Sequence, residues 1–566
     1  MEADVIETRP AATAKGPEAG PRTWWILPAA LFLVSIAVTQ APFAGDSIPY
    51  VVQIGDVRSG NAPPASLWEF GHILWRPLGY LLWDAFQAAI PDRIAWTPLL
   101  KMLAGLMLIN MMAGLASTLL IYALSWRLSG SRYAALVVTV LFVWGDAVLA
   151  YSQSGAPYIV ALAVLLAGLW WQLTAKEPRA GVVIGSACLF GFAALFWAPF
   201  AIALPAACCA GRFIKRPGLS QREMSWSQCL LAAAAGGAVF LAGVLAAAWL
   251  AGLRSGPETL SWVISAGHGM TQNRRAVRAV SGFVRLLIDL GEDGVSLKRM
   301  VLHDPYFPVS ILGVIRSSLW KVAVFYSFVA SVAVLAWKSP GRKSSIPLAA
   351  SAAVGAFAAV AVFEPSSPER LLPVLPFLLL ALSAGWPSSW RWAPALRRGI
   401  SGFAVLLVIL NLPSFEWRYS AEHREAQTQA EDFRKNAKFD DYLLVTTIAE
   451  PILRLNSFDP LNRPSPIRGM WILNPIDASA PAWRRTASLL ILENWNAGHD
   501  VWITSHVFSD RPNASSRWVE GDNPLVHWRD LAPFFRSLDF DPPTSPVNGF
   551  ARLRQTPANR ERLTRE

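Results

Sequence analysis

The sequence predicts an all-α polytopic membrane bundle of about 11 transmembrane helices, followed by a small extracytoplasmic C-terminal α/β domain. Three observations predict it. Of the 566 residues, 53% are hydrophobic and only 16% are charged, whereas soluble proteins carry about 25% charged residues. Apolar runs of about 18 residues or more recur along the chain. Beyond residue 414 the charge rises and short β-type runs appear.

The apolar segments have about the 20 residues that a helix needs to cross a bilayer. They cover residues 24–41, 97–123, 133–151, 157–174, 228–250, 311–337, 346–363, 369–386 and 399–413. The stretch 180–211 is too long for one helix, and basic residues flank both of its ends. It therefore predicts two short helices that break near Pro199 and return to the side where they began.

Lys and Arg in the short connections all fall on one side of this arrangement, which the positive-inside rule assigns to the cytoplasm. Residues 1–23 are then a disordered cytoplasmic tail, 24–413 the transmembrane domain, and 414–566 an extracytoplasmic domain, with long outer loops at 42–96 and 251–310. This topology accounts for the net charge of +11, so we expect membrane lipids and no nucleic acid as partners. The Arg- and Ala-rich composition indicates a bacterial inner membrane, with the C-terminus in the periplasm.

The C-terminal domain alternates short β-type runs with helical patterns. We expect strands at 442–447, 469–475, 500–508 and 549–555, with helices at 481–497 and 528–538.

Ionisable residues at the outer edge of a membrane bundle are costly to hold, so they are the first functional candidates. Asp46 follows the first span directly, although an ordinary loop carboxylate at a helix end explains it equally well. Glu69, His72 and Arg76 lie among three tryptophans in residues 68–83, which favours an amphipathic helix in the membrane interface. The short loop 152–158 offers Ser154 and Tyr158 as weaker candidates for contacts with sugar hydroxyls.

Three further groups lie on the outer side. Arg274 and Arg275 belong to a basic cluster that suits an anionic phosphate, but a solvated loop face explains it as well. His303 and Asp304 are too few ligands for a metal site. Glu369 and Arg370 stand at the mouth of a proline-rich span. A helix start explains the prolines and the acid there but does not require the arginine.

The order of these features resembles a known family. A single span, an acidic residue opening a long outer loop, the string Trp75-Arg76-Pro77-Leu78-Gly79-Tyr80 with His72 upstream, many spans, and a proline-rich outer entry at 369–377 follow one another. The chain is similar in this to the GT-C superfamily of polytopic membrane glycosyltransferases, particularly the bacterial mannosyltransferase-like branch that uses polyprenyl-phosphate sugars. The resemblance covers about residues 20–415. The family's His-Pro-Pro-Gly-Tyr type string is changed here, and the adjacent Asp-Glu pair of the protein O-mannosyl branch is absent.

The resemblance implies transfer of a sugar from a polyprenyl-phosphate donor to a glycan, lipid or protein acceptor, with inversion at the anomeric carbon. By position, Asp46 would be the catalytic base, with Asp56 as the alternative. Residues that would bind the substrate or its phosphate are His72, Arg76, Tyr80, Arg274, Arg275, Glu369 and Arg370. We assign no metal ligands and no cofactor beyond the donor lipid, and a divalent metal is compatible with the reaction.

Two other functions stay open. A transporter or flippase of a lipid-linked or anionic substrate would place charges at mid-membrane. The middles of these spans are almost free of charge and the candidates gather on one side, which favours an enzyme at the outer surface. A scaffold that recruits proteins through the C-terminal domain would depend on that domain and not on Asp46.

Overall fold

The computed structural model describes residues 23–39, 41, 46–94, 96–214, 223–265, 276–363, 367–415, 428, 431–438, 441–444, 482–511, 528–545 and 549–566. The tail 1–22, the arginines Arg274 and Arg275 and the predicted strand 469–475 lie outside these residues.

In the described residues of the transmembrane part, the regular secondary structure is helical, and turns and loops connect the helices. Its helices are α1 (Ile26–Ala37), α2 (Ser47–Arg58), α3 (Trp75–Ala89), α4 (Pro98–Ser129), α5 (Arg132–Val143), α6 (Asp146–Ser152), α7 (Tyr158–Thr174), α8 (Ala180–Phe196), α9 (Leu204–Phe213), α10 (Trp226–Leu250), α11 (Gly256–Ser265), α12 (Ala276–Arg285), α13 (Gly291–Leu302), α14 (Ile311–Val314), α15 (Trp320–Lys338), α16 (Arg342–Val362), α17 (Leu375–Gly385) and α18 (Ala393–Pro413). The 3-10 turns η3 (Ala198–Ala203), η5 (Pro368–Arg370) and η6 (Leu372–Val374) interrupt them, and a π-helical turn, η4 (Ile315–Leu319), joins α14 to α15.

In the described part of the chain, five helices are long and apolar enough to cross a membrane: α4, α10, the continuous stretch Ile311–Lys338, α16 and α18. A sixth span results if α5 and α6, which meet at a bend of 64°, are counted together. The predicted break near Pro199 is confirmed, because α8 ends at Phe196 and η3 follows.

Several predicted spans are shorter than expected. Helix α1 has 12 residues and α17 has 11, which at 1.5 Å per residue gives about 17–18 Å against a hydrocarbon core of about 30 Å. The predicted span 369–386 is replaced by the turns η5 and η6 before α17. Pro368 and Pro373 are the physical reason, because proline has no N–H to donate to a preceding carbonyl.

Small residues let α8 and α10 approach closely. A Cβ atom added to Gly191 would lie 2.6 Å from the carbonyl oxygen of Gly236, and one added to Gly236 would lie 2.8 Å from that of Ala187. Such glycine contacts are a common way to pack helices within a membrane. They hold α8, and the η3 turn after it, against the rest of the bundle.

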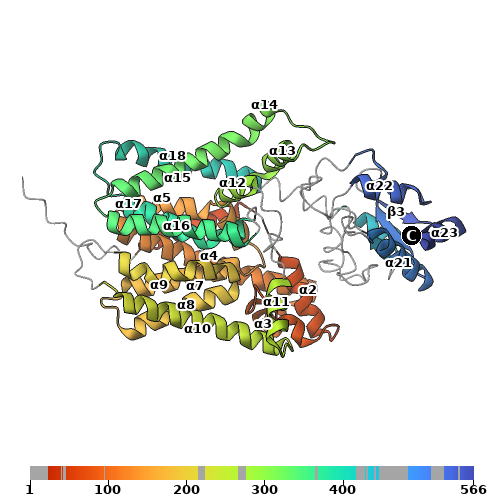
Figure 1. Ribbon diagram of the computed structural model, residues 1–566, viewed down its shortest axis with the longest axis horizontal. Coiled ribbons are helices and arrows are strands. Elements are labelled where there is room, and N and C mark those ends of the chain that lie inside the picture. The colour runs from red at the N-terminus through yellow and green to blue at the C-terminus, as the bar shows by residue number, and fades with distance from the viewer. Residues whose placement is uncertain are drawn as a thin grey trace, which may run out of the picture.

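Both long outer loops contain helices. Figure 1 shows α2, α3 and α11–α13 gathered at the end of the bundle nearest the C-terminal strands. The predicted amphipathic helix over 68–83 is wrong in its first half, because α3 begins only at Trp75. Residues 68–74 instead form turns, and the His72 side chain is fully buried. His72 and Trp197 fill the interior there, so this segment does not lie flat on a membrane surface.

The described C-terminal residues form a small sheet with helices. Strands β1 (Tyr442–Leu444), β2 (Val501–Thr504) and β3 (Phe550–Leu553) lie in the order β1-β2-β3, parallel between β1 and β2 and antiparallel between β2 and β3. Helices α21 (Trp483–Asn496), α22 (Trp528–Arg536) and α23 (Pro557–Arg565) accompany them. Three of the four predicted strands and both predicted helices are therefore present.

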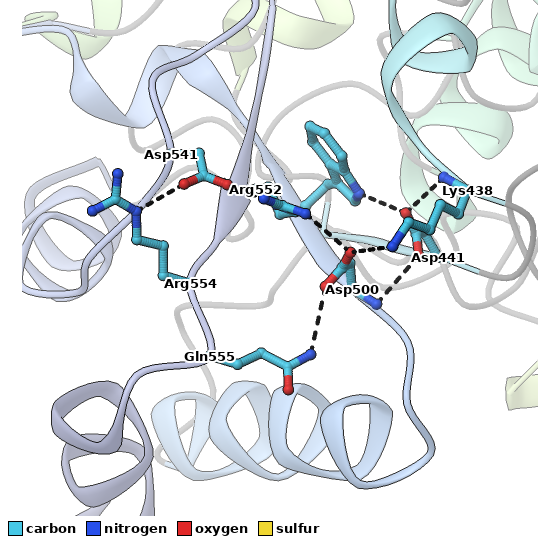
Figure 2. A network of polar contacts seen from close by, with 8 residues as sticks. Lys438, Asp441, Asp500, Asp541, Arg552, Arg554 and Gln555 are labelled. Carbon is cyan, nitrogen blue, oxygen red and sulfur yellow. Dashed lines mark hydrogen bonds and ion pairs between the residues drawn. The ribbon is translucent and has the colours of Figure 1, made fainter.

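A polar network ties the strands of this sheet together (Figure 2). Asp441, just before β1, accepts hydrogen bonds from the Trp502 indole at 2.9 Å and from the Asp500 backbone at 3.2 Å. On β3, Arg552 pairs with Asp541 at 2.6 Å and with Asp500 at 3.4 Å. These contacts cross from β1 through β2 to β3, so the network stabilises the sheet rather than forming an open site.

Candidate functional site

Asp46 lies at the start of α2 and accepts hydrogen bonds from two tyrosines. The Tyr158 hydroxyl donates to Oδ2 of Asp46 at 3.0 Å, and the Tyr50 hydroxyl donates to the same oxygen at 3.2 Å. Among the described residues, Oδ1 accepts no hydrogen bond, and the side chain is exposed. The Ser47 hydroxyl accepts the Gly155 backbone N–H at 2.9 Å, which ties the start of α2 to the loop before α7. Asp46 is thus fixed through one oxygen and open at the other.

Tyr50 connects Asp46 to a buried histidine. Its hydroxyl lies 2.6 Å from Nε2 of His72. The His72 ring stacks on Trp197 with ring centres 4.5 Å apart and planes within 6°. The backbone of Ala198 donates to the Gly71 carbonyl at 3.1 Å, so the turn that carries His72 is bound to the break after α8. The break at Pro199 therefore has a role in building this site.

Glu369 is the second carboxylate of the cluster. The Tyr151 hydroxyl donates to its Oε2 at 2.6 Å, and the Trp197 indole donates to its backbone carbonyl at 3.1 Å. Tyr151 and Tyr158 pack edge to face with ring centres 4.7 Å apart. Because one of these tyrosines binds Asp46 and the other binds Glu369, the two carboxylates belong to one continuous polar and aromatic cluster.

The two predicted arginines that the structure describes lie beside this cluster. Arg76 is buried, forms an ion pair with Glu69 and lies with its guanidinium carbon 5.3 Å from the centre of the Tyr50 ring. The Nε atom of Arg370 lies 4.0 Å from Oε1 of Glu369. Arg370 therefore lies beside Glu369, whereas Arg76 lies beside Tyr50 and is already paired with Glu69.

Two predicted site residues lie elsewhere. Asp56 is ten residues after Asp46, about 15 Å further along α2, and burial raises the pKa of its carboxyl group. Tyr80 packs under Arg58, whose guanidinium carbon is 4.8 Å from the Tyr80 ring and which also pairs with Asp84. The structure therefore brings together Asp46, His72, Arg76, Glu369 and Arg370. It places Asp56 towards the opposite end of α2, and Tyr80 of α3 beside that same end.

The local contacts of the remaining weaker candidates show which of them belong to the cluster. Tyr158 belongs to the site, whereas Ser154 is buried and its hydroxyl donates to the Tyr151 carbonyl at 3.1 Å. Asp304 accepts the backbone N–H groups of Tyr306 at 2.9 Å and Phe307 at 3.3 Å, next to His303 in a left-handed conformation (φ 54°). The His303–Asp304 pair therefore closes a turn after α13.

Sequence reasoning missed Tyr50, Tyr151 and Trp197. Tyr50 lies four residues after Asp46, the spacing that puts two side chains on one face of a helix, so this contact was available from the sequence. The Tyr151–Glu369 hydrogen bond joins residues 218 positions apart, and no local pattern indicates it.

Asn411 in α18 forms hydrogen bonds with backbone groups near the site. Nδ2 of Asn411 donates to the carbonyl oxygens of Trp144 at 2.6 Å and Leu287 at 2.7 Å, and its Oδ1 accepts the Asp289 N–H at 3.0 Å. Trp144 occupies the bend between α5 and α6, and α6 carries Tyr151. Asn411 thus satisfies backbone groups that the bend and the segment after α12 leave without helical partners.

No group of three or more His, Cys, Asp or Glu side chains within the described ranges is placed to hold a metal ion. The cluster itself offers Asp46 and Glu369, each already bonded to tyrosines.

Comparison by structure shows that the chain is similar to two solved structures of one protein. The crystal structure of ArnT from Cupriavidus metallidurans bound to undecaprenyl phosphate matches with a TM-score of 0.52 and 12% identity, over 95% of this chain and 99% of that one. The same protein in the apo state matches with a TM-score of 0.52 and 13% identity, over 94% and 97% of the two chains. This chain has the ArnT fold. By sequence, neither the family models nor the curated proteins that were searched give a match.

The ArnT fold accounts for the architecture along nearly the whole chain. The resemblance to the GT-C glycosyltransferases is thereby confirmed at the level of the fold. With five helices apolar and long enough to cross a bilayer in its described residues, the chain is an integral membrane protein. At 12–13% identity, the match shows the fold alone and assigns no role to the residues of the site.

Proposed function

We propose that the protein is a membrane glycosyltransferase that moves a sugar from a polyprenyl-phosphate-linked donor to an extracytoplasmic hydroxyl acceptor on a glycan, lipid or protein. The observation that supports this proposal is the cluster that contains Asp46, at the start of α2, and Glu369. Both carboxylates accept hydrogen bonds from tyrosines. The ArnT fold supports it, since one of the matched ArnT structures contains undecaprenyl phosphate.

Asp46 is the general base in this proposal. Its fixed Oδ2 orients the carboxylate, and its open Oδ1 is the oxygen that takes the proton from the acceptor hydroxyl. The acceptor oxygen then forms a bond to the anomeric carbon while the bond from that carbon to the phosphate breaks. A single displacement of this kind inverts the anomeric configuration. The polyprenyl phosphate leaves with the negative charge.

Arginines stabilise that leaving charge. Arg370 lies beside Glu369 and next to the cluster, and Arg274 and Arg275, outside the described residues, keep the phosphate-binding role expected from the sequence. Guanidinium groups form paired hydrogen bonds with phosphate oxygens, which is why they suit this role. Arg76 is a weaker candidate because Glu69 already neutralises it.

The proposed topology places the N-terminus in the cytoplasm, and α2, α3 and the C-terminal domain in the periplasm of a bacterial inner membrane. The lipid tail of the donor then lies in the bilayer and its sugar reaches Asp46 at the outer surface. The distribution of Lys and Arg supports this orientation.

The decisive experiment measures sugar transfer from a panel of radiolabelled polyprenyl-phosphate sugars in proteoliposomes. Asp46→Asn should lower the transfer rate by about two orders of magnitude or more, the range for loss of a general base. Glu177→Gln, which changes an exposed acid in another connection, should keep the wild-type rate. The anomeric configuration of the product tests the inversion.

Other outcomes would overturn the proposal. A large loss in Asp56→Asn with a normal Asp46→Asn would move the base to the other end of α2. If the wild type transfers no sugar but moves labelled lipid across the bilayer as well as Asp46→Asn does, the protein is a transporter.

A further inference from the structure

Asp46, Tyr50 and His72 form a chain of hydrogen bonds that leads from the exposed carboxylate into the interior. The Tyr50 hydroxyl is 3.2 Å from Oδ2 of Asp46 and 2.6 Å from Nε2 of His72. His72 is fully buried, whereas Asp46 is exposed. The histidine therefore does not face the solvent, and it contacts Tyr50 and Trp197 in the protein interior.

A hydroxyl has only one hydrogen to donate, and this decides how the chain is arranged. If Nε2 of His72 carries its hydrogen, that hydrogen points at the Tyr50 oxygen and the Tyr50 hydrogen is left for Asp46. If Nε2 instead presents its lone pair, Tyr50 donates to His72 and its hydrogen bond to Asp46 is lost. The state of His72 thus controls whether Asp46 is held by two tyrosines or by Tyr158 alone.

We propose that His72 is a positioning residue that acts through Tyr50, by donating from Nε2 and so directing the Tyr50 hydroxyl onto the carboxylate of Asp46. This inference rests on the proposed function, because it assigns His72 a part in orienting the general base.

The surroundings fix both partners for this task. The His72 ring is stacked on Trp197, whose indole is in turn bound to the Glu369 carbonyl at 3.1 Å. Burial, and then the neighbouring Asp46 carboxylate, raises the pKa of Tyr50 well above its usual value, so Tyr50 remains a hydroxyl that can donate. The charge of Arg76 lowers the pKa of Tyr50, the charge of Glu69 raises it, and a hydrogen bond with Tyr158 lowers it.

A double-mutant cycle tests the inference. Tyr50→Phe removes only the hydroxyl, and His72→Phe keeps a flat ring against Trp197 but removes Nε2. Each single variant should lower kcat for sugar transfer about tenfold, the effect of one lost hydrogen bond, and leave KM for the lipid donor unchanged. The double variant should be no slower than Tyr50→Phe, since His72 acts only through that hydroxyl.

His72→Gln is the conservative variant, because its amide can donate from about the position of Nε2. It should recover most of the lost kcat in the presence of Tyr50 and change nothing in the Tyr50→Phe background. If His72→Phe does not fold, His72→Leu, which also has no donor at this position, replaces it in the cycle, and His72→Gln is compared with that variant in both backgrounds.

A purely structural role gives a different pattern. Losses that multiply in the double variant, or a His72→Gln variant as slow as His72→Phe, would overturn the inference while Asp46→Asn still identifies the base. A wild type that transfers no sugar would overturn the proposed function and the positioning role together.

Discussion

The Tyr158 hydroxyl donates to Oδ2 of Asp46 at 3.0 Å, across 112 residues of chain. Tyr158 begins α7 and Asp46 precedes α2, so this hydrogen bond joins the start of α2 to the start of α7. Through Tyr151, which packs against Tyr158, the same connection reaches Glu369. The carboxylate at the start of α2 is thus held by the packed bundle, although it lies in what the sequence shows as a loop.

Replacement of Tyr158 by phenylalanine should slow transfer without unfolding the protein. Tyr158→Phe removes one of the two donors to Asp46 and leaves the aromatic packing in place. We expect a loss of about tenfold in kcat. Steady-state kinetics in proteoliposomes would measure it. Tyr133→Phe is the matched control, because Tyr133 is exposed and its hydroxyl donates to Ser401 at 2.8 Å. Equal losses in both variants would contradict this assignment.

Loss of Asn411 should destabilise the bundle. Asn411→Ala removes three hydrogen bonds to buried backbone groups at the α5–α6 bend and after α12. The free energy of unfolding should fall by about 2–4 kcal/mol, because three buried backbone groups then each lose a hydrogen bond. Thermal unfolding in detergent would detect this. Ile409→Ala, on the same helix but 62% exposed, is the control and should cost much less. A stable Asn411→Ala variant would show that the bend needs no such support.

The close contact between α8 and α10 can be tested at neighbouring glycines. Gly236→Ala places a methyl group 2.8 Å from the Ala187 carbonyl oxygen, whereas the same change at Gly237 meets nothing within 4 Å. The first change should cost about 1–3 kcal/mol because the helices must separate. The second should be neutral or stabilise α10 by up to about 1 kcal/mol, since alanine favours helix. Melting temperatures of the two variants would check the difference, and identical values would refute the close packing.

The C-terminal sheet should weaken in acid. Hydrogen bonds and charges from Arg554 and Arg552 lower the pKa of Asp541. A carboxyl group whose pKa is lower in the folded state stabilises the fold above its unfolded pKa of about 3.9, and this contribution is lost as the pH falls through the lower, folded value. Below about pH 4, hydrogen exchange of β2 and β3 in the full-length protein should therefore increase beyond its intrinsic pH dependence.

Asp541→Asn should remove this acid sensitivity and raise exchange already at neutral pH. Glu561→Gln, in an exposed pair with Arg565, should behave as the wild type, because exposed ion pairs contribute little. If Asp541→Asn kept the wild-type response to acid, another carboxyl group of the network would be responsible (Figure 2).

Local patterns in the sequence predicted the parts of the fold that depend on neighbouring residues. Apolar runs located the long helices of the bundle, Pro199 located the break after α8, and short β-type runs located β1, β2 and β3. They failed at 68–83, where the helical pattern continues into a turn because His72 packs on Trp197. They also failed at 369–386, where a long apolar run did not predict the 3-10 turns before α17.

The sequence by itself determined that this is a membrane protein, and it singled out Asp46 and Glu369 as charged residues at the ends of apolar segments. Only the tertiary structure decided that these two carboxylates share one cluster, and that Asp56 and Tyr80 stand apart from it. The reason is physical. Burial of apolar side chains follows from composition and period, which are local. A hydrogen bond between residues 112 or 218 positions apart exists only after the helices that carry them have packed.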